Sequence, residues 1–401
     1  MVRRLRDALT IDDLRAMSRR RVPRMFYQYC DSGSYTQSTM ERNVDDFAKI
    51  SLRQRIACDI SDRNTGSTIL GREVGMPLGL APVGMTGMHH PDGEIAAAFA
   101  AEKAGVPFTL GTLSITPLEA VVDAVQAPIW FQLYVVKDRD FVRSLIDRAK
   151  AAQCGALVVT LDLQLTGQRH VDLRNGLSAP PKPSLSAAWQ IGSKPGWCLR
   201  MLRTKHRSFG NIVGHVADVN SYSSIAEWTA HQFEPKLDWD MIKMFRDLWP
   251  GPLVLKGVQE VEDAAKCIEV GADALIVSNH GGRQLDGAAS SISKLPAIAQ
   301  AVGDKIEVYM DGGIRSGQDV LKAAALGARA AFIGRPYIFG LGAGGEPGVT
   351  RALDIIAKEL SITMALCGLR TLDCDLSSII DYPDSTLRGL PCANSKVANH
   401  A

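Results

Sequence analysis

The chain has 401 residues, of which 46% are apolar and 22% are charged, and its formal net charge is +2. This composition is typical of a globular protein with a sizeable core and excludes a largely disordered chain. The small net charge, without a long basic run that carries interleaved aromatic residues, argues against nucleic acid as a partner.

The eight cysteines are scattered without a C-x-x-C pair, which predicts reduced thiols and neither a disulfide framework nor a metal site. Residues 1–21, MVRRLRDALTIDDLRAMSRRR, carry charge on every turn and lack the apolar stretch of a secretion signal. No later segment reaches about 18 uninterrupted apolar residues. We expect a cytoplasmic protein without a membrane span, which begins with an N-terminal helical segment, residues 1–60.

Short apolar runs rich in β-branched residues recur along the chain, and most are separated by stretches of helical periodicity that end in glycine. The predicted helices include 93–105, 138–155, 260–271 and 316–327. The predicted strands are 76–83, 106–112, 128–135, 156–162, 252–257, 274–280, 306–313 and 330–335. This βα rhythm predicts an α/β protein with a (β/α)8 TIM barrel, in which residues 1–401 form a single domain.

A doubly wound sheet is the competing fold, because GLGAGG at 340–345 is similar to a dinucleotide-binding fingerprint. We consider this signal weak, since it follows a predicted helix start and not a strand. The TIM barrel therefore stays the preferred fold.

The rhythm is interrupted once, by a long loop insertion after strand 4, residues 167–235. Residues 182–207 of this loop contain Trp189, Trp197 and six basic residues but no acidic one. Such a segment can lie in a membrane interface, where cations meet anionic lipid and indole rings sit at headgroup depth. A lid or a subunit contact explains the same composition.

In a barrel the carboxyl ends of all strands face one mouth, so polar residues at strand ends converge. The residues that do so here are Gln132, Tyr134, Thr160, Asp162, Lys256, Ser278, His280, Asp311 and Arg335. A histidine can act as a general base, and an aspartate beside it fixes its tautomer, so we predict that His280 and Asp162 form such a pair. Arg283 offers a planar fork for a carboxylate, and Gly281 and Gly282 let the backbone approach a ligand.

Two motifs on neighbouring strands, DGGIRSG at 311–317 and IGRP at 333–336, predict a phosphate site. Their glycines, Gly312, Gly313 and Gly334, expose backbone N–H groups, and Arg315 and Arg335 supply cations. Because no metal-ligand cluster accompanies them, we expect an organic phosphate cofactor.

Taken in order, RMFYQYCDSGS, LAPVGMTG, FQLYV, SNHGGRQLD and DGGIRSG resemble the FMN-dependent L-2-hydroxy acid oxidases and dehydrogenases, most closely the membrane-associated bacterial L-lactate dehydrogenases. The resemblance covers about residues 11–375. It implies FMN as the cofactor, an L-2-hydroxy acid as the substrate and a homotetramer.

The resemblance also implies roles for individual residues. His280 would be the base supported by Asp162, and Tyr134 would contact the substrate hydroxyl or the keto oxygen that forms. Tyr27, Arg169 and Arg283 would bind the carboxylate, and Lys256 would stabilise the reduced flavin, as its charge also suggests. The remaining FMN contacts would come from Val83, Gly84, Gly111, Gln132, Thr160, Ser278, Asp311, Gly312, Gly313, Arg315, Gly334 and Arg335.

Three features depart from the pattern of the plant oxidases. Gly111 replaces a serine that contacts the flavin, Leu113 stands where glycolate oxidase has a tryptophan, and DLQLTG lacks the usual Thr-Pro. Leu113 suggests room for more than a two-carbon acid. We interpret His89 and His90, in GMHHPDGE, as surface residues and not as catalytic ones.

These features predict oxidation of an L-2-hydroxy acid. The preferred candidate reaction is oxidation of L-lactate to pyruvate. The basic loop favours a quinone or another carrier as the electron acceptor and a peripheral position on the inner face of the cell membrane. The alternatives are an oxidase that uses O2 or acts on a larger acid such as mandelate, and a non-catalytic flavin- or lipid-binding protein. The sequence does not separate removal of the Cα proton from removal of the hydroxyl proton with hydride transfer.

Overall fold

The computed structural model describes residues 4–177, 185–216 and 232–381. At its centre is a parallel eight-stranded sheet with the order β4-β11-β10-β9-β8-β7-β6-β5. A parallel bridge between Leu80 and Phe108 joins the two ends of this order, so the sheet closes into a ring. The strands are β4 (Leu78–Leu80), β5 (Thr109–Gly111), β6 (Trp130–Tyr134), β7 (Ala156–Thr160), β8 (Leu253–Val258), β9 (Ala274–Val277), β10 (Glu307–Asp311) and β11 (Ala330–Ile333). The predicted (β/α)8 barrel is confirmed.

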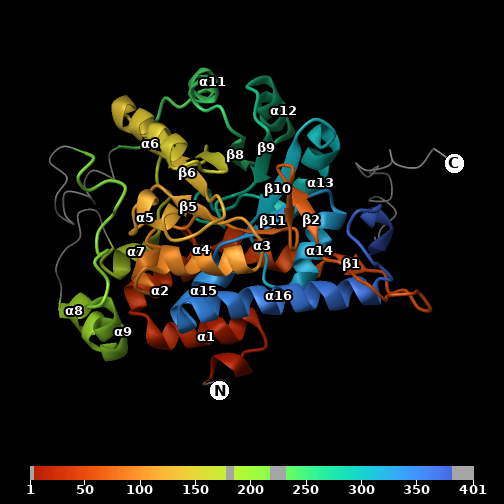
Figure 1. Ribbon diagram of the computed structural model, residues 1–401, viewed down its shortest axis with the longest axis horizontal. Coiled ribbons are helices and arrows are strands. Elements are labelled where there is room, and N and C mark those ends of the chain that lie inside the picture. The colour runs from red at the N-terminus through yellow and green to blue at the C-terminus, as the bar shows by residue number, and fades with distance from the viewer. Residues whose placement is uncertain (1–3, 178–184, 217–231, 382–401) are drawn as a thin grey trace.

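Helices surround this ring (Figure 1). They are α4 (Gly93–Lys103), α5 (Leu118–Val122), α6 (Arg139–Ala151), α11 (Trp239–Leu248), α12 (Val261–Glu269), α13 (Ser291–Val302), α14 (Gly317–Ala325), α15 (Arg335–Gly344) and α16 (Glu346–Leu366). Local sequence sets several starts: Asp138 caps α6, and Ser316 forms a capping box with Asp319 at α14. GLGAGG lies in the second half of α15 and at its C-cap, so it is no strand-to-helix turn.

The residues before the barrel fold over its sides and one end. Their elements are η1 (Leu5–Asp7), α1 (Ile11–Arg21), α2 (Arg24–Asp31), α3 (Ser38–Ala48), β1 (Ser51–Leu52), β2 (Ser67–Ile69) and β3 (Arg72–Val74). The short helix η2 (Thr86–Met88) follows β4. β1 pairs with β12 (Ile380–Asp381), which follows η3 (Leu376–Ile379), so the C-terminal end of the described chain is held against the segment after α3. α1 packs along α15.

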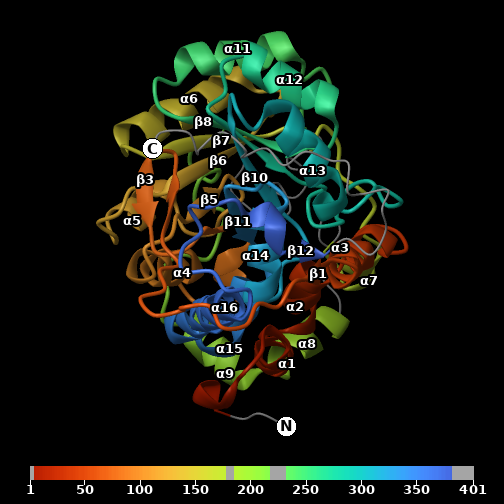
Figure 2. The same ribbon diagram turned by 90° about the vertical axis from the view of Figure 1, so that its right-hand side faces the viewer.

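The insertion after β7 contains α7 (His170–Arg174), α8 (Leu185–Gly192) and α9 (Pro195–Met201). Both ribbon views place α8 and α9 beside α1 and α2 (Figures 1 and 2). Trp189 is 77% exposed, as an interfacial residue requires. Trp197 is not: it is buried, stacks on Phe26 and donates from Nε1 to the Met88 carbonyl at 2.9 Å. Lys182 lies outside the described residues.

Alternation along the strands positions the functional residues. Inside the barrel, Trp130, Val158, Val254, Ile276 and Tyr309 form an apolar layer, which Ile69 from the β2–β3 hairpin covers. Because successive side chains of a strand point to opposite faces, the next inward residues lie two positions further on. In five strands these residues are polar: Gln132, Thr160, Lys256, Ser278 and Asp311. The same pleat therefore places a dry core at one end and polar groups at the other.

Candidate active site

A cavity of about 1220 Å³ opens at the carboxyl ends of the barrel strands. This exceeds the roughly 300–1,000 Å³ of a usual small-molecule site, so the cavity has room for a cofactor and a substrate together. The predicted residues that line it are Val83, Gly84, Tyr134, Thr160, Arg169, Lys256, His280, Arg283, Asp311, Gly312, Gly313, Arg315, Gly334 and Arg335. The structure thus brings most of the predicted site together.

Five predicted residues are not among the lining residues. Tyr27 is discussed below, and the other four, Gly111, Gln132, Asp162 and Ser278, lie directly behind the cavity wall. Gln132 donates to the Thr160 hydroxyl at 3.0 Å, and Ser278 accepts from Lys256 Nζ at 2.8 Å. A Cβ at Gly111 would lie 3.4 Å from Gln132 Oε1. These contacts indicate that Gln132 and Ser278 hold lining side chains in place.

His280 and Asp162 form the expected pair, with 2.9 Å between Nδ1 and Oδ1. Because an ionised carboxylate can only accept, Nδ1 carries the hydrogen and the lone pair of the neutral imidazole is on Nε2. Nε2 lies 3.5 Å from the Tyr134 hydroxyl, at the cavity. The imidazole can therefore accept a proton from a molecule bound there.

Local backbone geometry makes this pair possible. His280 has a φ of +58°, an uncommon left-handed conformation that costs free energy in a non-glycine residue and often marks a functional site. Gly257, at a bulge in β8, is required for a different reason, because a Cβ there would lie 2.8 Å from the Cβ of Asp162. Of the two glycines after the histidine, Gly281 lines the cavity, whereas Gly282 makes room for Met40 of α3, since a Cβ on Gly282 would lie 2.5 Å from the Met40 nitrogen.

Burial lowers the pKa of His280 below its ordinary value near 6.5, although Asp162 opposes the shift. Burial alone would raise the pKa of Asp162, but the charge of His280 lowers it by more. The pKa of Asp162 is therefore below its ordinary value. The resting pair is therefore a neutral imidazole beside a carboxylate at neutral pH.

This direction predicts the pH dependence of substrate oxidation. Since only the neutral imidazole can take a proton, kcat/KM should be constant above pH 7 and fall tenfold per pH unit below the pKa of His280, which lies under 6.5. The measurement is kcat/KM for flavin reduction between pH 4.5 and 9. An acid limb centred above pH 7 would contradict the assignment.

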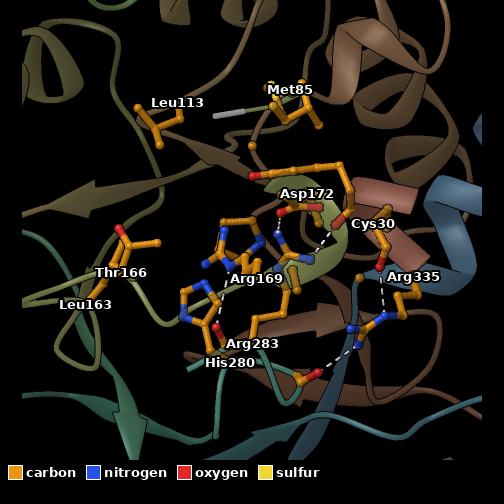
Figure 3. A pocket seen from close by; sticks show the side chains of 18 of the residues that line it. Cys30, Met85, Leu113, Leu163, Thr166, Arg169, Asp172, His280, Arg283 and Arg335 are labelled. Atoms are coloured by element: carbon orange, nitrogen blue, oxygen red, sulfur yellow. Dashed lines mark hydrogen bonds and ion pairs between the residues drawn. The ribbon is translucent and has the colours of Figure 1, made fainter. Parts of the chain in front are cut away.

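Two arginines converge beside the histidine (Figure 3). Arg283 Nη1 donates to the Ser32 carbonyl at 3.0 Å, and its guanidinium lies 4.6 Å above the ring of Tyr29. Arg169 Nε donates to the Arg283 carbonyl at 3.4 Å, and burial together with Arg283 lowers the pKa of Arg169. Two neighbouring half-buried cations favour binding of an anion, and their planar forks match a carboxylate.

The buried Asp172 was not predicted from the sequence, and it partly balances these cations. It lies 3.6 Å from Arg283 Nη2, too far for a good hydrogen bond, and both Arg283 Nη2 and Asp172 Oδ1 are buried without a hydrogen-bond partner. A buried donor in this state costs free energy until it is satisfied. The guanidinium group of Arg283 therefore retains capacity for a bound carboxylate.

The prediction for Tyr27 is wrong by two positions. Tyr27 is buried on the other side of α2, where it interacts with Asp31 and Arg15, and it does not line the cavity. Tyr29 lines the cavity instead. Residues two apart on a helix point in very different directions, so a register error in FYQY exchanges one tyrosine for the other.

Gln284, which the sequence analysis did not single out, connects the two loops that carry the site. Its Nε2 donates to the carbonyls of Asp162 at 2.6 Å and Leu165 at 2.8 Å, and its Oε1 accepts from the Gly167 N–H at 3.1 Å. The loop of His280 and Arg283 is thereby fixed to the loop of Asp162 and Arg169. Only its place next to Arg283 in SNHGGRQLD could have drawn attention to it.

Lys256 is buried and forms an ion pair with Asp311, 2.8 Å from Nζ to Oδ2. Burial opposes the charge, but Asp311 and Asp162 outweigh it, so the pKa of Lys256 is raised and the ammonium group is charged. Asp311 Oδ1 is buried without a hydrogen-bond partner. The floor of the cavity therefore holds a fixed positive charge and an unused acceptor.

We expect Lys256→Met to lower the free energy of unfolding by about 3–5 kcal/mol, because it leaves the Asp311 carboxylate buried and unpaired. The matched control is Lys294→Met, which breaks an exposed ion pair with Glu260 and should cost less than about 1 kcal/mol. Urea unfolding of the FMN-free proteins measures both values. Equal losses in the two variants would contradict a buried charge pair.

At the ends of β10 and β11 the cavity is lined by Arg315 and Arg335. Burial lowers the pKa of both, that of Arg335 to about 9 with the nearby Arg315 as a further cause. Arg335 donates to the carbonyls of Cys30, Gly281 and Ser32 at 2.8, 2.9 and 3.0 Å, so it also joins α2 to the loop after β9. Two half-buried guanidinium groups suit the doubly charged phosphate of FMN.

The interpretation of His89 as a surface residue is wrong. Its side chain is buried, neither ring nitrogen has a hydrogen-bond partner, and burial lowers its pKa to about 3. His90 is half-buried and its Nδ1 lies 3.0 Å from the Pro91 carbonyl. Neither residue lines the cavity.

Comparison with known proteins decides the family. The model of the family described as FMN-dependent dehydrogenase matches residues 18–380. The chain belongs to the FMN-dependent dehydrogenase family. FMN is accordingly its cofactor, and the cavity fits it: it is large enough, it presents two half-buried arginines for the phosphate, and Asp311 Oδ1 is a buried acceptor without a partner.

The chain is 45% identical over 369 residues to the L-lactate dehydrogenase of Caulobacter vibrioides (strain NA1000 / CB15N), which covers 92% of this chain and 95% of that protein. It is 40% identical to the L-lactate dehydrogenase of Vibrio parahaemolyticus, covering 92% and 98%. Among solved structures, the monotopic membrane protein (S)-mandelate dehydrogenase has a TM-score of 0.89 at 32% identity, covering 94% of this chain and 99% of that one. A mandelate oxidase has a TM-score of 0.79 at 35% identity, covering 93% and 98%.

Two further observations bear on the site and its surroundings. Across residues 4–177, 185–216 and 232–381, histidine, cysteine and acidic side chains form no group of three that could hold a metal ion. Within the same ranges, no helix has the length and apolar character to cross a bilayer.

Proposed function

We propose that this FMN-dependent dehydrogenase oxidises L-lactate to pyruvate. The observation that carries the proposal is a neutral imidazole, 2.9 Å from its supporting carboxylate, that shares a cavity with Arg169 and Arg283. A 2-hydroxy acid needs both features: a base for its proton and cations for its carboxylate. The two L-lactate dehydrogenases at 45% and 40% identity support this acid as the substrate.

FMN, when bound, would take the two electrons and one of the two hydrogens that the substrate loses. Arg315 and Arg335 would hold its phosphate, and Lys256 would lie by its ring system. Arg283 and Arg169 bind and orient the carboxylate of the substrate, with Tyr29 packed against the Arg283 guanidinium. Tyr134 donates to the substrate oxygen. Nε2 of His280 takes the other hydrogen as a proton, from Cα or from the hydroxyl group, and Asp162 stabilises the resulting imidazolium.

The test is reduction of the flavin in the absence of air. L-Lactate should bleach the yellow protein, and D-lactate should not, because the carboxylate clamp and the base fix only one face of the substrate carbon. If neither isomer nor any other 2-hydroxy acid bleaches it, a flavin-binding protein without catalytic activity would be the better account.

A larger acid such as L-mandelate is the second candidate, favoured by the cavity volume and by Leu113 in its wall. The mandelate dehydrogenase and oxidase structures point the same way. Comparing kcat/KM for L-lactate and L-mandelate decides between them. A higher value for L-mandelate would overturn the lactate assignment.

We further propose that electrons leave to a quinone or another lipid-soluble carrier, and that the protein is peripheral to the inner face of the cell membrane. One side of the cavity is apolar and built by α2, η2, α8 and α9, with Met25, Phe26, Met88, Ile191, Trp197 and Met201 as its lining. α8 and α9 also expose apolar side chains outwards, including Trp189. The solved mandelate dehydrogenase described as monotopic supports this position.

The acceptor is tested by reoxidation of the lactate-reduced enzyme, which a short-chain quinone should perform at least about tenfold faster than dissolved O2. Equal rates with both acceptors would favour an oxidase.

The homotetramer that the family resemblance implies also stays a proposal. Light scattering of the purified protein measures the oligomeric state.

A further inference from the structure

We propose that a second, basic pocket binds the phosphate of an anionic phospholipid headgroup. This headgroup pocket has a volume of about 330 Å³ and is lined by Arg19, Arg24, Tyr27, Gln28 and Lys194. It lies between the end of α1, the start of α2 and the turn that joins α8 to α9. The inference rests on the proposed membrane contact and names the lipid chemistry that this contact recognises.

The side chains of the headgroup pocket are arranged as donors. Lys194 Nζ donates to the Arg20 carbonyl at 2.7 Å, which fixes the α8–α9 turn on α1. Arg24 Nε donates to Gln28 Oε1 at 2.9 Å, and Asn175 donates to the same oxygen at 2.8 Å, so the Gln28 amide nitrogen is left to donate. Among the residues that the structure describes, no carboxylate lines this pocket. Three cations and an amide donor match the oxygens of a phosphate group.

Helix electrostatics explain only part of this cluster. Arg19 lies in the last turn of α1, where the helix dipole favours a cation. Arg24, however, is the first residue of α2, where the dipole disfavours a cation, and no side chain caps that end. Lys194 comes from a third segment, the cap of α9. An anion held between them would remove the mutual repulsion and satisfy the start of α2.

The surroundings of the headgroup pocket point to a lipid as the source of the phosphate. On α8, Leu185 is 93% and Trp189 is 77% exposed, and Leu199 and Leu202, on α9 and at its C-cap, are 65% and 68% exposed. Both ribbon views show these helices at the end of the molecule where α1 lies (Figures 1 and 2). Apolar side chains that flank a phosphate site would enter the acyl region while the phosphate occupies the headgroup level.

The experiment uses the full-length FMN-loaded protein and vesicles of phosphatidylcholine with or without phosphatidylglycerol. The pocket variants are Arg24→Gln and Lys194→Gln, and the matched control is Arg203→Gln, an exposed cation of the same insertion outside the pocket. A cation that acts only through the surface field contributes about 1 kcal/mol, so the control should lose about fivefold in affinity for anionic vesicles. Each pocket variant should lose at least about twentyfold, and L-lactate should reduce the flavin of all three at the wild-type rate.

Equal losses in pocket and control variants would overturn the inference. If inorganic phosphate, at ionic strength matched with chloride, binds the vesicle-free wild type in the micromolar range but not Arg24→Gln, the pocket takes free phosphate and the lipid assignment is wrong. Trp189→Ser separates the two proposals. If it weakens vesicle binding while the pocket variants behave like Arg203→Gln, the membrane contact holds and the headgroup pocket fails; if the wild type binds no vesicles, both fail.

Discussion

Exchange of His280 for asparagine should lower kcat/KM for L-lactate by about 10²- to 10⁴-fold while FMN stays bound, because it removes the base of the reaction. Asparagine is the informative replacement. His280 has a φ of +58°, and asparagine adopts this left-handed conformation more readily than most residues. The backbone of the loop can therefore persist without the imidazole, and Ser278, which accepts from the His280 N–H at 3.1 Å, can keep its bond.

The matched control is His206→Asn. His206 is also paired with a carboxylate, Nδ1 to Asp92 Oδ1 at 2.8 Å, but it does not line the cavity. This variant should keep wild-type flavin reduction within about twofold. Stopped-flow bleaching by L-lactate, with the flavin content measured from absorbance, compares the two. A His280→Asn protein that is loaded with FMN and retains a tenth of the wild-type rate would exclude His280 as the base.

The second large effect is expected for Arg283→Met, with a loss in kcat/KM for L-lactate of about 30- to 4000-fold. Removing one partner of a buried charge pair costs roughly 2–5 kcal/mol, and every 1.4 kcal/mol is a factor of ten. Arg283→Lys should recover little of this loss. A lysine brings the charge but not the planar fork, and it cannot stack in the same way on the ring of Tyr29, which lies 4.6 Å from the guanidinium carbon.

A neutral substrate separates binding of the carboxylate from a general disturbance of the site. L-Lactamide lacks the negative charge, so its slower oxidation should change less than about tenfold in Arg283→Met, and the preference for lactate over lactamide should collapse. Arg246→Met is the control for the structural role, because Arg246 also donates to backbone carbonyls, among them Gly251, away from the cavity. If Arg283→Met loses lactate and lactamide oxidation equally, the arginine only supports the fold.

The active-site cavity and the headgroup pocket are built from different elements of the fold. His280 and Arg283 belong to the barrel mouth, whereas the headgroup pocket is built from α1, α2 and the α8–α9 turn. Variants at one should leave the readout of the other unchanged. Catalysis and membrane binding can thus be tested separately in one protein.

Helices and loops show where reasoning from the sequence failed. In FYQY the tyrosine chosen was Tyr27, while Tyr29 lines the cavity. His89 was placed at the protein surface but is buried, and Gln284 was overlooked. A membrane interface was one of the explanations considered for the segment of Trp197, but this side chain is buried. Each of these residues has a side chain whose surroundings come from a distant segment: Trp197, for example, stacks on Phe26 of α2.

The strands, by contrast, were determined by the sequence itself. The runs around Gln132, Thr160, Lys256, Ser278 and Asp311 place polar residues two positions after apolar ones, and a strand turns successive side chains to opposite faces. In a closed barrel only one face points inward, so this alternation alone assigns the polar residues to the mouth. On a helix or in a loop no such two-way choice exists, and the neighbours that decide which side is buried become known only when the chain has packed.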